Sequence, residues 1–338
     1  MLQASGFLLN TVFCLTLIGA GVLYGILLQK YKIFPFELIR EIYYFVKYRL
    51  KINIDNRPII YGPYSIGIYS GKEPFCLQDN FVKNPVLTGK DVSDIYADFV
   101  ADPFIVFSEK KYFMFFEALN RKTRKGEIAY AESADLIKWT YRNVVIKEKF
   151  HMSYPYVFEW QNEYYMIPES SEDRSVRLYK ALSFPKKWQH IANLLPRYPY
   201  NDPSIFRYNN KWWMFVNAAN NLYLFLSDEL CFGWRAHPMS PVVEGDSRIS
   251  RPAGRVVMVG DEIFRFAQDS SKYYGEKVLA IKITSLDEYN YAEKLMTDSP
   301  VVTKSGHGWN ASGMHHVDLH KIGEKWIGVV DGHDSIIT

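Results

Sequence analysis

The strongest constraint on the fold is an internal repeat, because a chain that repeats one short pattern builds the same structural unit several times. Three segments align without a gap: "ADPFIVFSEKKYFMFFE" (101–117), "SYPYVFEWQNEYYMIPE" (153–169) and "NDPSIFRYNNKWWMFVN" (201–217). A fourth, "SRPAGRVVMVGDEIFRFAQ" (250–268), needs two inserted residues, and a fifth, "HHVDLHKIGEKWIGVVD" (315–331), has valine in place of proline. Each copy is an apolar run, a polar turn and an aromatic run, which predicts a β-hairpin.

The spacing of the copies is typical of propeller blades. The residue before the proline lies at 102, 154, 202 and 251, with 316 as its equivalent, so the steps are 52, 48, 49 and 65 residues. Further strand-like stretches fill the intervals, at 126–133, 175–182, 221–228 and 278–284. Four strands in each of five copies predict an all-β, five-bladed β-propeller with little helix.

An additional strand-like segment, 57–71, precedes the first copy. We expect it to pair with the last blade and close the ring, which removes exposed strand edges. The alternative fold, a β-sandwich of irregular hairpins, does not account for five copies of one pattern.

The N-terminal region predicts a membrane anchor. Residues 7–28 carry no charged side chain over 22 positions, and at about 1.5 Å per residue they can cross a hydrocarbon core of about 30 Å. The preceding "MLQASG" has no basic residue, which favours a retained anchor over a cleaved signal peptide. Residues 30–56 mix aromatic and basic side chains, as expected of an amphipathic helix on a membrane surface, with an ordinary linker helix as the alternative.

These observations predict three segments: a membrane anchor (1–29), a juxtamembrane amphipathic helix or linker (30–56) and the propeller (57–338). The anchor makes the protein single-pass, and the basic flank favours a cytoplasmic location for the propeller.

Composition excludes some classes of function. The formal net charge of +3 and the lack of a dense basic run in the propeller region argue against nucleic acid as a partner. Aromatic residues make up 16% of the chain, which favours strands and suits sugar-binding surfaces. Cys14 lies in the predicted anchor, while Cys76 and Cys231 are expected to be two separate buried thiols, with one disulfide as the alternative and their redox state open.

The repeat also places polar residues at one end of the predicted channel, because the first strand of each blade starts, and the second ends, on the same face. The starts are Asp102, Tyr154, Asp202, Arg251 and His316, and the ends are Glu117, Glu169, Asn217, Gln268 and Asp331. Turn capping or pairing with Arg251 or Arg255 would explain individual acids in this ring. The whole ring, with His315 beside it, indicates a pocket for a neutral polyol such as a sugar.

The motif "HHVDLH" (315–320) contains groups that can bind metal ions. Alternation along a strand puts His316, Asp318 and His320 on one face, which favours a structural or sugar-binding role over a metal site. Zinc-ligand spacings, phosphate-cradling glycine loops and Ser-His-Asp signatures are lacking in the sequence, so no metal or other cofactor is predicted.

The repeated hairpins with acids at the strand starts resemble the five-bladed propellers of glycoside hydrolase family 43. A more specific resemblance extends from about residue 95 to 331 and is carried by "DPFIVF", "MFFEALNRKTRKGEIAYAES", "HMSYPYVFE", "YYMIPESSE", "RLYKALSFPKKW", "RPAGRV" and "FRFAQDSSKYYGEKV". In these motifs the chain is similar to the N-terminal propeller domain of plant glucosamine inositolphosphorylceramide glycosyltransferases and to its stand-alone bacterial homologues.

The resemblance to the hydrolases implies roles for individual residues. Asp102 matches the general base and Asp202 the acid that tunes the catalytic pair, but Arg251 stands where the general acid, a glutamate, is expected. Arginine cannot deliver a proton at neutral pH. Glu117 or Glu169 could supply the acid, with Arg251 holding an anionic group of the substrate. Tyr154, Gln268, His315, His316 and Asp331 complete the predicted substrate-binding set.

The resemblance to the transferases implies a glycolipid context. Those enzymes carry a further catalytic domain that uses a nucleotide sugar and a metal through a DxD motif, and no DxD occurs in this sequence, so transferase activity is not expected of this chain alone. The leading prediction is a membrane-anchored, glycosidase-like enzyme acting on a glycolipid or a cell-envelope polysaccharide. The alternatives are a catalytically silent glycan-binding module that serves a partner glycosyltransferase and, more weakly, a propeller that binds only proteins.

Overall fold

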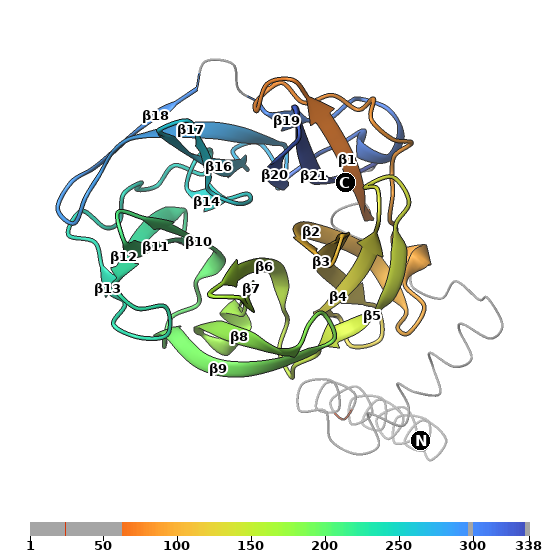
Figure 1. Ribbon diagram of the computed structural model, residues 1–338, viewed down its shortest axis with the longest axis horizontal. Coiled ribbons are helices and arrows are strands. Elements are labelled where there is room, and N and C mark those ends of the chain that lie inside the picture. Colours follow the sequence, from red (N-terminus) through yellow and green to blue (C-terminus); the bar gives the residue numbers. More distant parts are fainter. Residues whose placement is uncertain (1–23, 25–62, 297–299, 335–338) are drawn as a thin grey trace, which may run out of the picture. The chain divides into compact units, whose positions relative to one another are not determined.

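The computed structural model describes residues 24, 63–296 and 300–334, and its strands all lie in one unit of the chain, Ile59–Thr338. They form five separate sheets arranged around a common centre, with β2, β6, β10, β14 and β20 innermost (Figure 1). The prediction of an all-β, five-bladed propeller is confirmed, and the alternative of a two-sheet sandwich is wrong.

The strands follow the repeat closely. Blade one contains β2 (Ala97–Ser108), β3 (Lys111–Asn120), β4 (Lys125–Ser133) and β5 (Thr140–Ile146), and blade two contains β6 (Ser153–Trp160), β7 (Glu163–Glu169), β8 (Ser175–Ser183) and β9 (Lys187–Pro196). Blade three contains β10 (Asn201–Tyr208), β11 (Lys211–Ala218), β12 (Asn221–Ser227) and β13 (Arg235–Ala236). Blade four contains β14 (Arg251–Pro252), β15 (Val257–Val259), β16 (Glu262–Asp269), β17 (Lys277–Leu286), β18 (Tyr291–Leu295) and β19 (Val302–Thr303).

Blade five closes the ring and differs from the prediction of four strands. It contains β20 (Val317–Ile322), β21 (Lys325–His333) and the N-terminal strand β1 (Tyr64–Gly71), in the order β1-β21-β20. All eight residues of β1 pair antiparallel with β21. The expected closing strand is therefore confirmed, and it substitutes for strands that the fifth copy lacks.

Helix is scarce among the described residues, as predicted. Between residues 63 and 334 the described part of the chain has three short 3-10 turns: η1 (Gly89–Asp91), η2 (Ser171–Asp173) and η3 (Gly308–Asn310).

The second strand of each blade (β3, β7, β11, β16 and β21) is buried on both faces, which explains why most of its positions are apolar. In β3, Phe113 and Phe115 pack into the cluster shared with blades two and three, while Met114 and Phe116 pack against blade five. Successive side chains of a strand point to opposite faces of the sheet, so one strand supplies both neighbouring interfaces. The core is thus a series of layers between blades.

The innermost strand of blade four is interrupted where the sequence needs two inserted residues. Between β14 and β15 lies Gly254, whose φ is +144°. A Cβ at this position would lie 1.8 Å from the carbonyl oxygen of Val317, and the Val317 amide donates to the Ala253 carbonyl at 2.9 Å. Only glycine allows blades four and five to approach so closely.

Two predictions about the N-terminal region and the cysteines have different outcomes. The expected anchor (7–28) and juxtamembrane helix (30–56) fall outside the described residues, apart from Tyr24, and within the described part of the chain no helix is long and apolar enough to cross a membrane. Cys76 and Cys231 are separate free thiols, as expected, but Cys76 is exposed and Cys231 only half-buried, whereas burial was expected of both.

The close approach at Gly254 generates a stability prediction. Gly254→Ala should lower the free energy of unfolding by more than about 3 kcal/mol, because the new methyl group meets backbone that cannot move independently. Gly260→Ala is the matched control: its φ is also positive, but the space around its Cβ is open, so it should cost about 1 kcal/mol. Urea denaturation measures both, and equal losses would show that the contact with blade five is not limiting.

Candidate functional site

In blades one to three, the residue before the repeated proline lies in a β-bulge of the inner strand. Asp102, Tyr154 and Asp202 have φ values of +54°, +47° and +49°, and the pairing register shifts at each of these points. A bulge redirects a side chain and leaves backbone groups unpaired. The Asp102 amide donates to Asp331 Oδ2 at 2.9 Å, and the Tyr154 amide donates to Asp102 Oδ2 at 3.2 Å, so channel carboxylates accept from the bulged backbone of the next blade.

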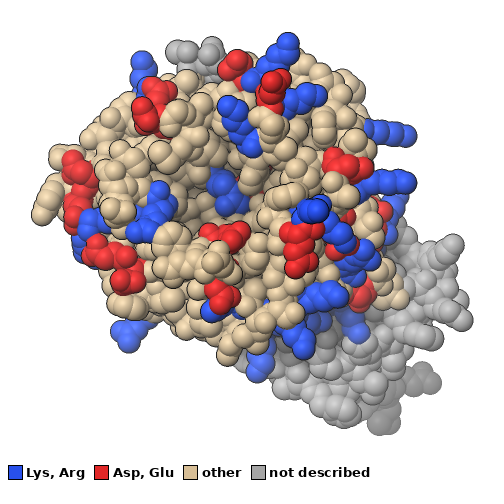
Figure 2. Space-filling model, in the orientation of Figure 1, with Lys and Arg blue, Asp and Glu red and all other residues tan. Residues whose placement is uncertain are grey.

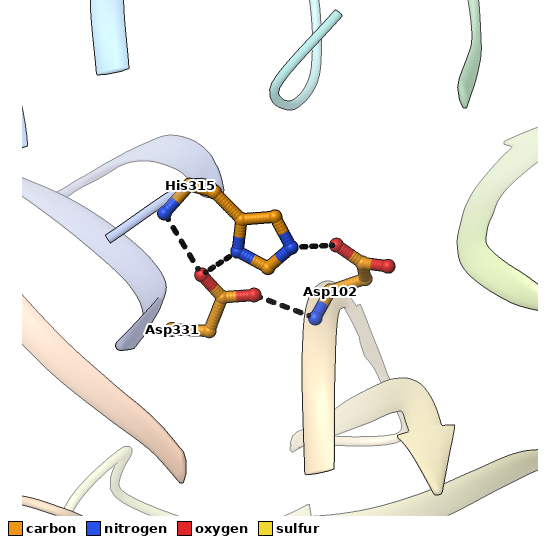
Figure 3. Close-up of side chains that lie close together, drawn as sticks. All are labelled: Asp102, His315 and Asp331. Carbon is orange, nitrogen blue, oxygen red and sulfur yellow. Dashed lines mark hydrogen bonds and ion pairs between the residues drawn. The ribbon is translucent and has the colours of Figure 1, made fainter. Parts of the chain in front are cut away.

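Asp102, His315 and Asp331 form a buried triad between blades one and five (Figure 3). His315 Nδ1 lies 2.7 Å from Asp331 Oδ1, and the His315 amide donates to the same oxygen at 3.2 Å. On the other side of the ring, His315 Nε2 lies 3.5 Å from Asp102 Oδ1. The second oxygen of Asp102 is used by the backbone, so Oδ1 is the one that faces the histidine.

Arg251 organises the opposite side of the ring. Its Nε donates to Asp202 Oδ2 at 2.5 Å, and its Nη2 lies 3.8 Å from Glu169 Oε2. The guanidinium carbon is 5.2 Å from the centroid of the Tyr274 ring, a cation-π distance. The Arg251 side chain is 27% exposed, against 5% for Asp202 and 9% for Glu169, so the cation is the member of this group that meets solvent.

Glu117 is the acid with the fewest compensating contacts. Its side chain is 6% exposed, and Oε1 is buried without a hydrogen-bond partner. The imidazole of His151 lies beside it, with Nε2 3.5 Å from that oxygen. Burial raises the pKa of Glu117 well above its usual range, and four more carboxylates raise it further: Asp102, Glu169, Asp331 and Asp202. Their joint influence shows that the five predicted acids converge.

The other titratable groups of the ring are balanced by partners. Burial raises the pKa of Asp102 to about 6 against the opposing effect of His315, and burial raises that of Asp202 to about 7 against the opposing effect of Arg251. For Asp331, the nearby His315 overcomes burial and holds the pKa below its usual range. For His315, the two aspartates overcome burial and raise the pKa. Protonation in this ring is therefore shared between closely coupled groups.

Tyr154 and His316, two of the predicted substrate-binding residues, pack in the channel itself. The Tyr154 hydroxyl accepts from the Gly254 amide at 2.6 Å and lies 2.7 Å from Ser204 Oγ. His316 is fully buried, and its Nε2 lies 2.9 Å from the Pro103 carbonyl. These contacts connect the inner strands of different blades, and the contact of either side chain with a substrate stays a prediction.

The remaining positions of the sequence-based ring are also hydrogen-bonded within the protein. The side-chain amide of Gln268 donates to Ser270 Oγ at 2.9 Å. The side-chain amide of Asn217 donates to the backbone carbonyls of Asn221 and Ser250. Both side chains are buried. Their contact with a substrate stays a prediction.

The second half of "HHVDLH" holds the inner strands together. Asp318 accepts from Arg255 Nε at 2.9 Å and from the Ile105 amide at 2.7 Å, and its Oδ2 lies 2.8 Å from His320 Nε2. The Arg255 guanidinium also donates to the Val157 carbonyl at 2.9 Å. These contacts agree with the structural role that the alternation favours.

Among the described residues, Asp102, His315 and Asp331 are those whose ligand atoms converge closely enough for a cation, within 4.8 Å. Hydrogen bonding accounts for the same arrangement, because His315 Nδ1 and Asp331 Oδ1 already satisfy each other. The group is therefore a hydrogen-bonded triad.

Sequence reasoning missed two residues of the ring, Tyr274 and His151. Tyr274 lies between β16 and β17, near Arg251 and 5.4 Å from the His315 ring. His151 lies between β5 and β6. Both belong to connections outside the repeated hairpin, so alignment of the copies could not find them. A search for aromatic and histidine residues in the connections that lead to the channel would have included both.

The fold and this buried ring of acids define the class: a five-bladed propeller with a polar channel mouth. The space-filling view is hollowed at the centre of the blades, with charged side chains in and beside the hollow (Figure 2). Glycoside hydrolases are among the solved structures with a similar fold. One comes from the GH130 family of mannoside phosphorylases, which contains hydrolases that target β-1,2 mannosidic linkages in Candida mannan (TM-score 0.56, 11% identity, 83% of this chain and 99% of that one).

A second is a family 117 glycoside hydrolase from the marine bacterium Zobellia galactanivorans (TM-score 0.51, 15% identity, 80% of this chain and 90% of that one). At these identities the likeness establishes the fold alone.

The chain belongs to the family described as "Glucosamine inositolphosphorylceramide transferase 1, N-terminal", whose model matches residues 57–333. It is 31% identical over 298 residues to glucosamine inositolphosphorylceramide transferase 1 of Oryza sativa subsp. japonica and 29% identical to that of Arabidopsis thaliana. These matches cover 80% of this chain but 40% and 39% of the plant proteins. The chain thus spans about two-fifths of the length of these relatives, and the resemblance read from its motifs is confirmed.

The burial of Glu117 predicts an unusual pH dependence of stability. A carboxyl group whose pKa is raised on folding stabilises the protein at low pH, and this contribution is lost as the pH rises above the unfolded value near 4.5. Glu117→Gln should match wild type near pH 5 and become more stable than wild type by about 1 kcal/mol for each further pH unit. Urea denaturation from pH 5 to 8 measures the difference.

The control is Glu163→Gln, because that side chain is 48% exposed and pairs with Lys180 at the far end of its hairpin. Its stability difference from wild type should vary little over the same range. A Glu117→Gln curve parallel to that of wild type would show that Glu117 is ionised in the folded protein without penalty.

Proposed function

We propose that the channel mouth binds a glycan and performs glycosidase-like acid–base chemistry on a glycolipid or a cell-envelope polysaccharide. The observation that supports this most directly is the pairing of Glu117 with Asp102, two buried carboxyl groups in electrostatic contact but in different surroundings. Asp102 faces His315, whereas Glu117 Oε1 has no hydrogen-bond partner. Glu117 therefore keeps its proton to higher pH, and two carboxyl groups separated in this way fit the roles of acid and base.

The chemistry follows from these protonation states. Glu117 gives its proton to the glycosidic oxygen as the bond from that oxygen to the anomeric carbon breaks. Asp102 Oδ1 takes a proton from a water molecule, whose oxygen forms the new bond to the anomeric carbon. The pair of Asp331 and His315 orients Asp102, and the proton gained by Asp102 replaces in the site the one that Glu117 lost. Glu117 thus fills the role for which the sequence left Glu117 and Glu169 as alternatives.

Recognition of the substrate falls to the more exposed members of the ring. Tyr274 offers an aromatic face near Arg251, and aromatic faces pack against the apolar side of a sugar ring. Arg251 is partly exposed beside this ring and can hold an anionic group such as the phosphate of a glycolipid headgroup. The plant relatives are named for inositolphosphorylceramide, which supports a substrate that carries a phosphate group.

One observation favours the second candidate, a catalytically silent glycan-binding module that presents substrate to a partner glycosyltransferase. Arg251 occupies the blade-four position at which the hydrolase pattern requires a glutamate, and it is held there by Asp202 and Glu169. A ring arranged around a cation can bind a sugar without turning it over. Fold alone does not distinguish the two functions.

Turnover distinguishes them. The purified chain is incubated with panels of glycolipids and oligosaccharides, and both binding and released sugar are measured. Asp102→Asn and Glu117→Gln should each lower release by at least about 100-fold, the usual contribution of a general acid or base, while binding changes little. Glu163→Gln, outside the ring, should behave as wild type.

Wild type that binds a glycan and never releases sugar would contradict the enzyme and support the binding module. Wild type that binds no glycan would contradict both. For an active enzyme, kcat/KM should rise as the pH passes about 6, where Asp102 ionises, and fall at higher pH when Glu117 loses its proton.

We also propose that residues 7–28 anchor the protein as a single-pass segment, with the propeller on the cytoplasmic side. The support is the uncharged stretch and the basic residues that follow it. The chain should stay with membranes during carbonate extraction, and deletion of residues 7–28 should release it. Protease added to sealed cells should leave the propeller intact; digestion of the propeller would place it on the outer side.

A further inference from the structure

His151 links the most isolated acid of the ring to the protein surface. It lies in the connection between blades one and two, and its side chain is 34% exposed, against 6% for Glu117. His151 Nε2 lies 3.5 Å from Glu117 Oε1, the buried oxygen without a hydrogen-bond partner. Catalytic hydrogen bonds are often this long in the absence of substrate and shorten when it binds.

The backbone determines which nitrogen of His151 carries the proton. The Gly126 amide donates to His151 Nδ1 at 2.9 Å, so Nδ1 accepts and cannot hold a proton of its own. In the neutral ring the hydrogen must then be on Nε2, the nitrogen that faces Glu117. Burial holds the pKa of His151 below its usual range, so this neutral form persists at neutral pH.

The local backbone holds the two side chains together. The Met152 amide donates to the Gly126 carbonyl at 3.1 Å, and the His151 amide donates to Glu172 Oε2 at 2.5 Å. A Cβ on residue 126 would lie 2.6 Å from Glu117 Oε1 and 2.2 Å from the Met152 carbonyl oxygen. Glycine at this position therefore allows the connection and the acid to share one space.

We propose that His151 is a positioning residue for Glu117: its Nε2–H group donates to Oε1 and so restricts the acidic proton to Oε2. A carboxylic acid has one oxygen that accepts and one that carries the proton, and a permanent donor at Oε1 selects the accepting oxygen. The same donor stabilises the carboxylate after the proton has left. His151 does not relay protons, because Nδ1 is occupied by the backbone.

Other charges around the pair do not supply this donor. Four carboxylates act on Glu117 and oppose its ionisation, from Asp102, Glu169, Asp202 and Asp331. The charged groups that act on His151 are Glu172, which raises its pKa, and Lys125, which lowers it. Within the part of the chain that the structure describes, His151 is the one group recorded within ion-pair distance of a Glu117 oxygen.

The inference rests on the proposed function because it takes Glu117 as the general acid, but its test needs no substrate. The carbonyl stretch of protonated Glu117 is identified in infrared difference spectra as the band lost in Glu117→Gln, and its pH titration is then followed. His151→Met removes the donor and should raise the pKa of Glu117 by about one unit. His151→Gln, which keeps an N–H group at a similar reach, should shift it by less than half as much.

The matched control is His307→Met, at an exposed histidine in another connection, which should leave the titration unchanged. Equal titrations in wild type and His151→Met, or equal shifts in the Met and Gln variants, would overturn the proposal. If the variants fail to fold, nitrogen NMR of wild type decides, because a proton on His151 Nδ1 would overturn it and one on Nε2 would support it. Lack of turnover on every glycan would contradict the proposed function alone.

Discussion

The structure depends on how the inner edges of the blades are satisfied. The first strand of each blade pairs on one side only, so its other edge faces the channel with backbone groups that have no strand partner. Channel carboxylates accept from several of them: Asp331 from the Asp102 amide, Asp102 from the Tyr154 amide and Asp318 from the Ile105 amide. The acids are thus buried because the architecture uses them as acceptors, and their burial then raises or redistributes their proton affinity. The same carboxylates therefore hold the inner strands in place and form the polar mouth of the channel.

Electrostatic balance explains why members of one ring behave differently. Asp331 has a histidine at hydrogen-bond distance and a backbone donor, and Asp202 has a guanidinium. Glu117, from the second strand of blade one, has no such cation: the charges that act on it are those of other carboxylates, and the histidine 3.5 Å from its Oε1 is neutral. A nearby cation favours the charged form of a carboxyl group, whereas burial and nearby carboxylates favour the protonated form. The ring therefore contains carboxyl groups of different proton affinity without a change of residue type.

The sequence was sufficient for the features that repeat. Aromatic hairpins at blade-like spacing predicted the five sheets and the closing strand, and the residue before each proline marked the bulge that directs Asp102 and Asp202 to the channel. Features outside the repeat could not be predicted in this way. The three-stranded fifth blade depends on β1, more than two hundred residues away in sequence, and His151 and Tyr274 reach the ring from connections. Tyr154 aligns with the two aspartates, yet its longer side chain extends to Gly254 in blade four.

Arg251 shows why alignment to a catalytic pattern does not settle activity. In the hydrolase pattern its position carries the proton donor, and an arginine there removes that donor while adding a positive charge that Asp202 and Glu169 must balance. The loss matters only if no other carboxyl group retains a proton near the same point. In the proposed function Glu117 of blade one meets that condition, because burial among other acids raises its pKa. Under that proposal the electrostatics of blade one compensate for the arginine in blade four, and the arginine is available to select substrates that carry negative charge.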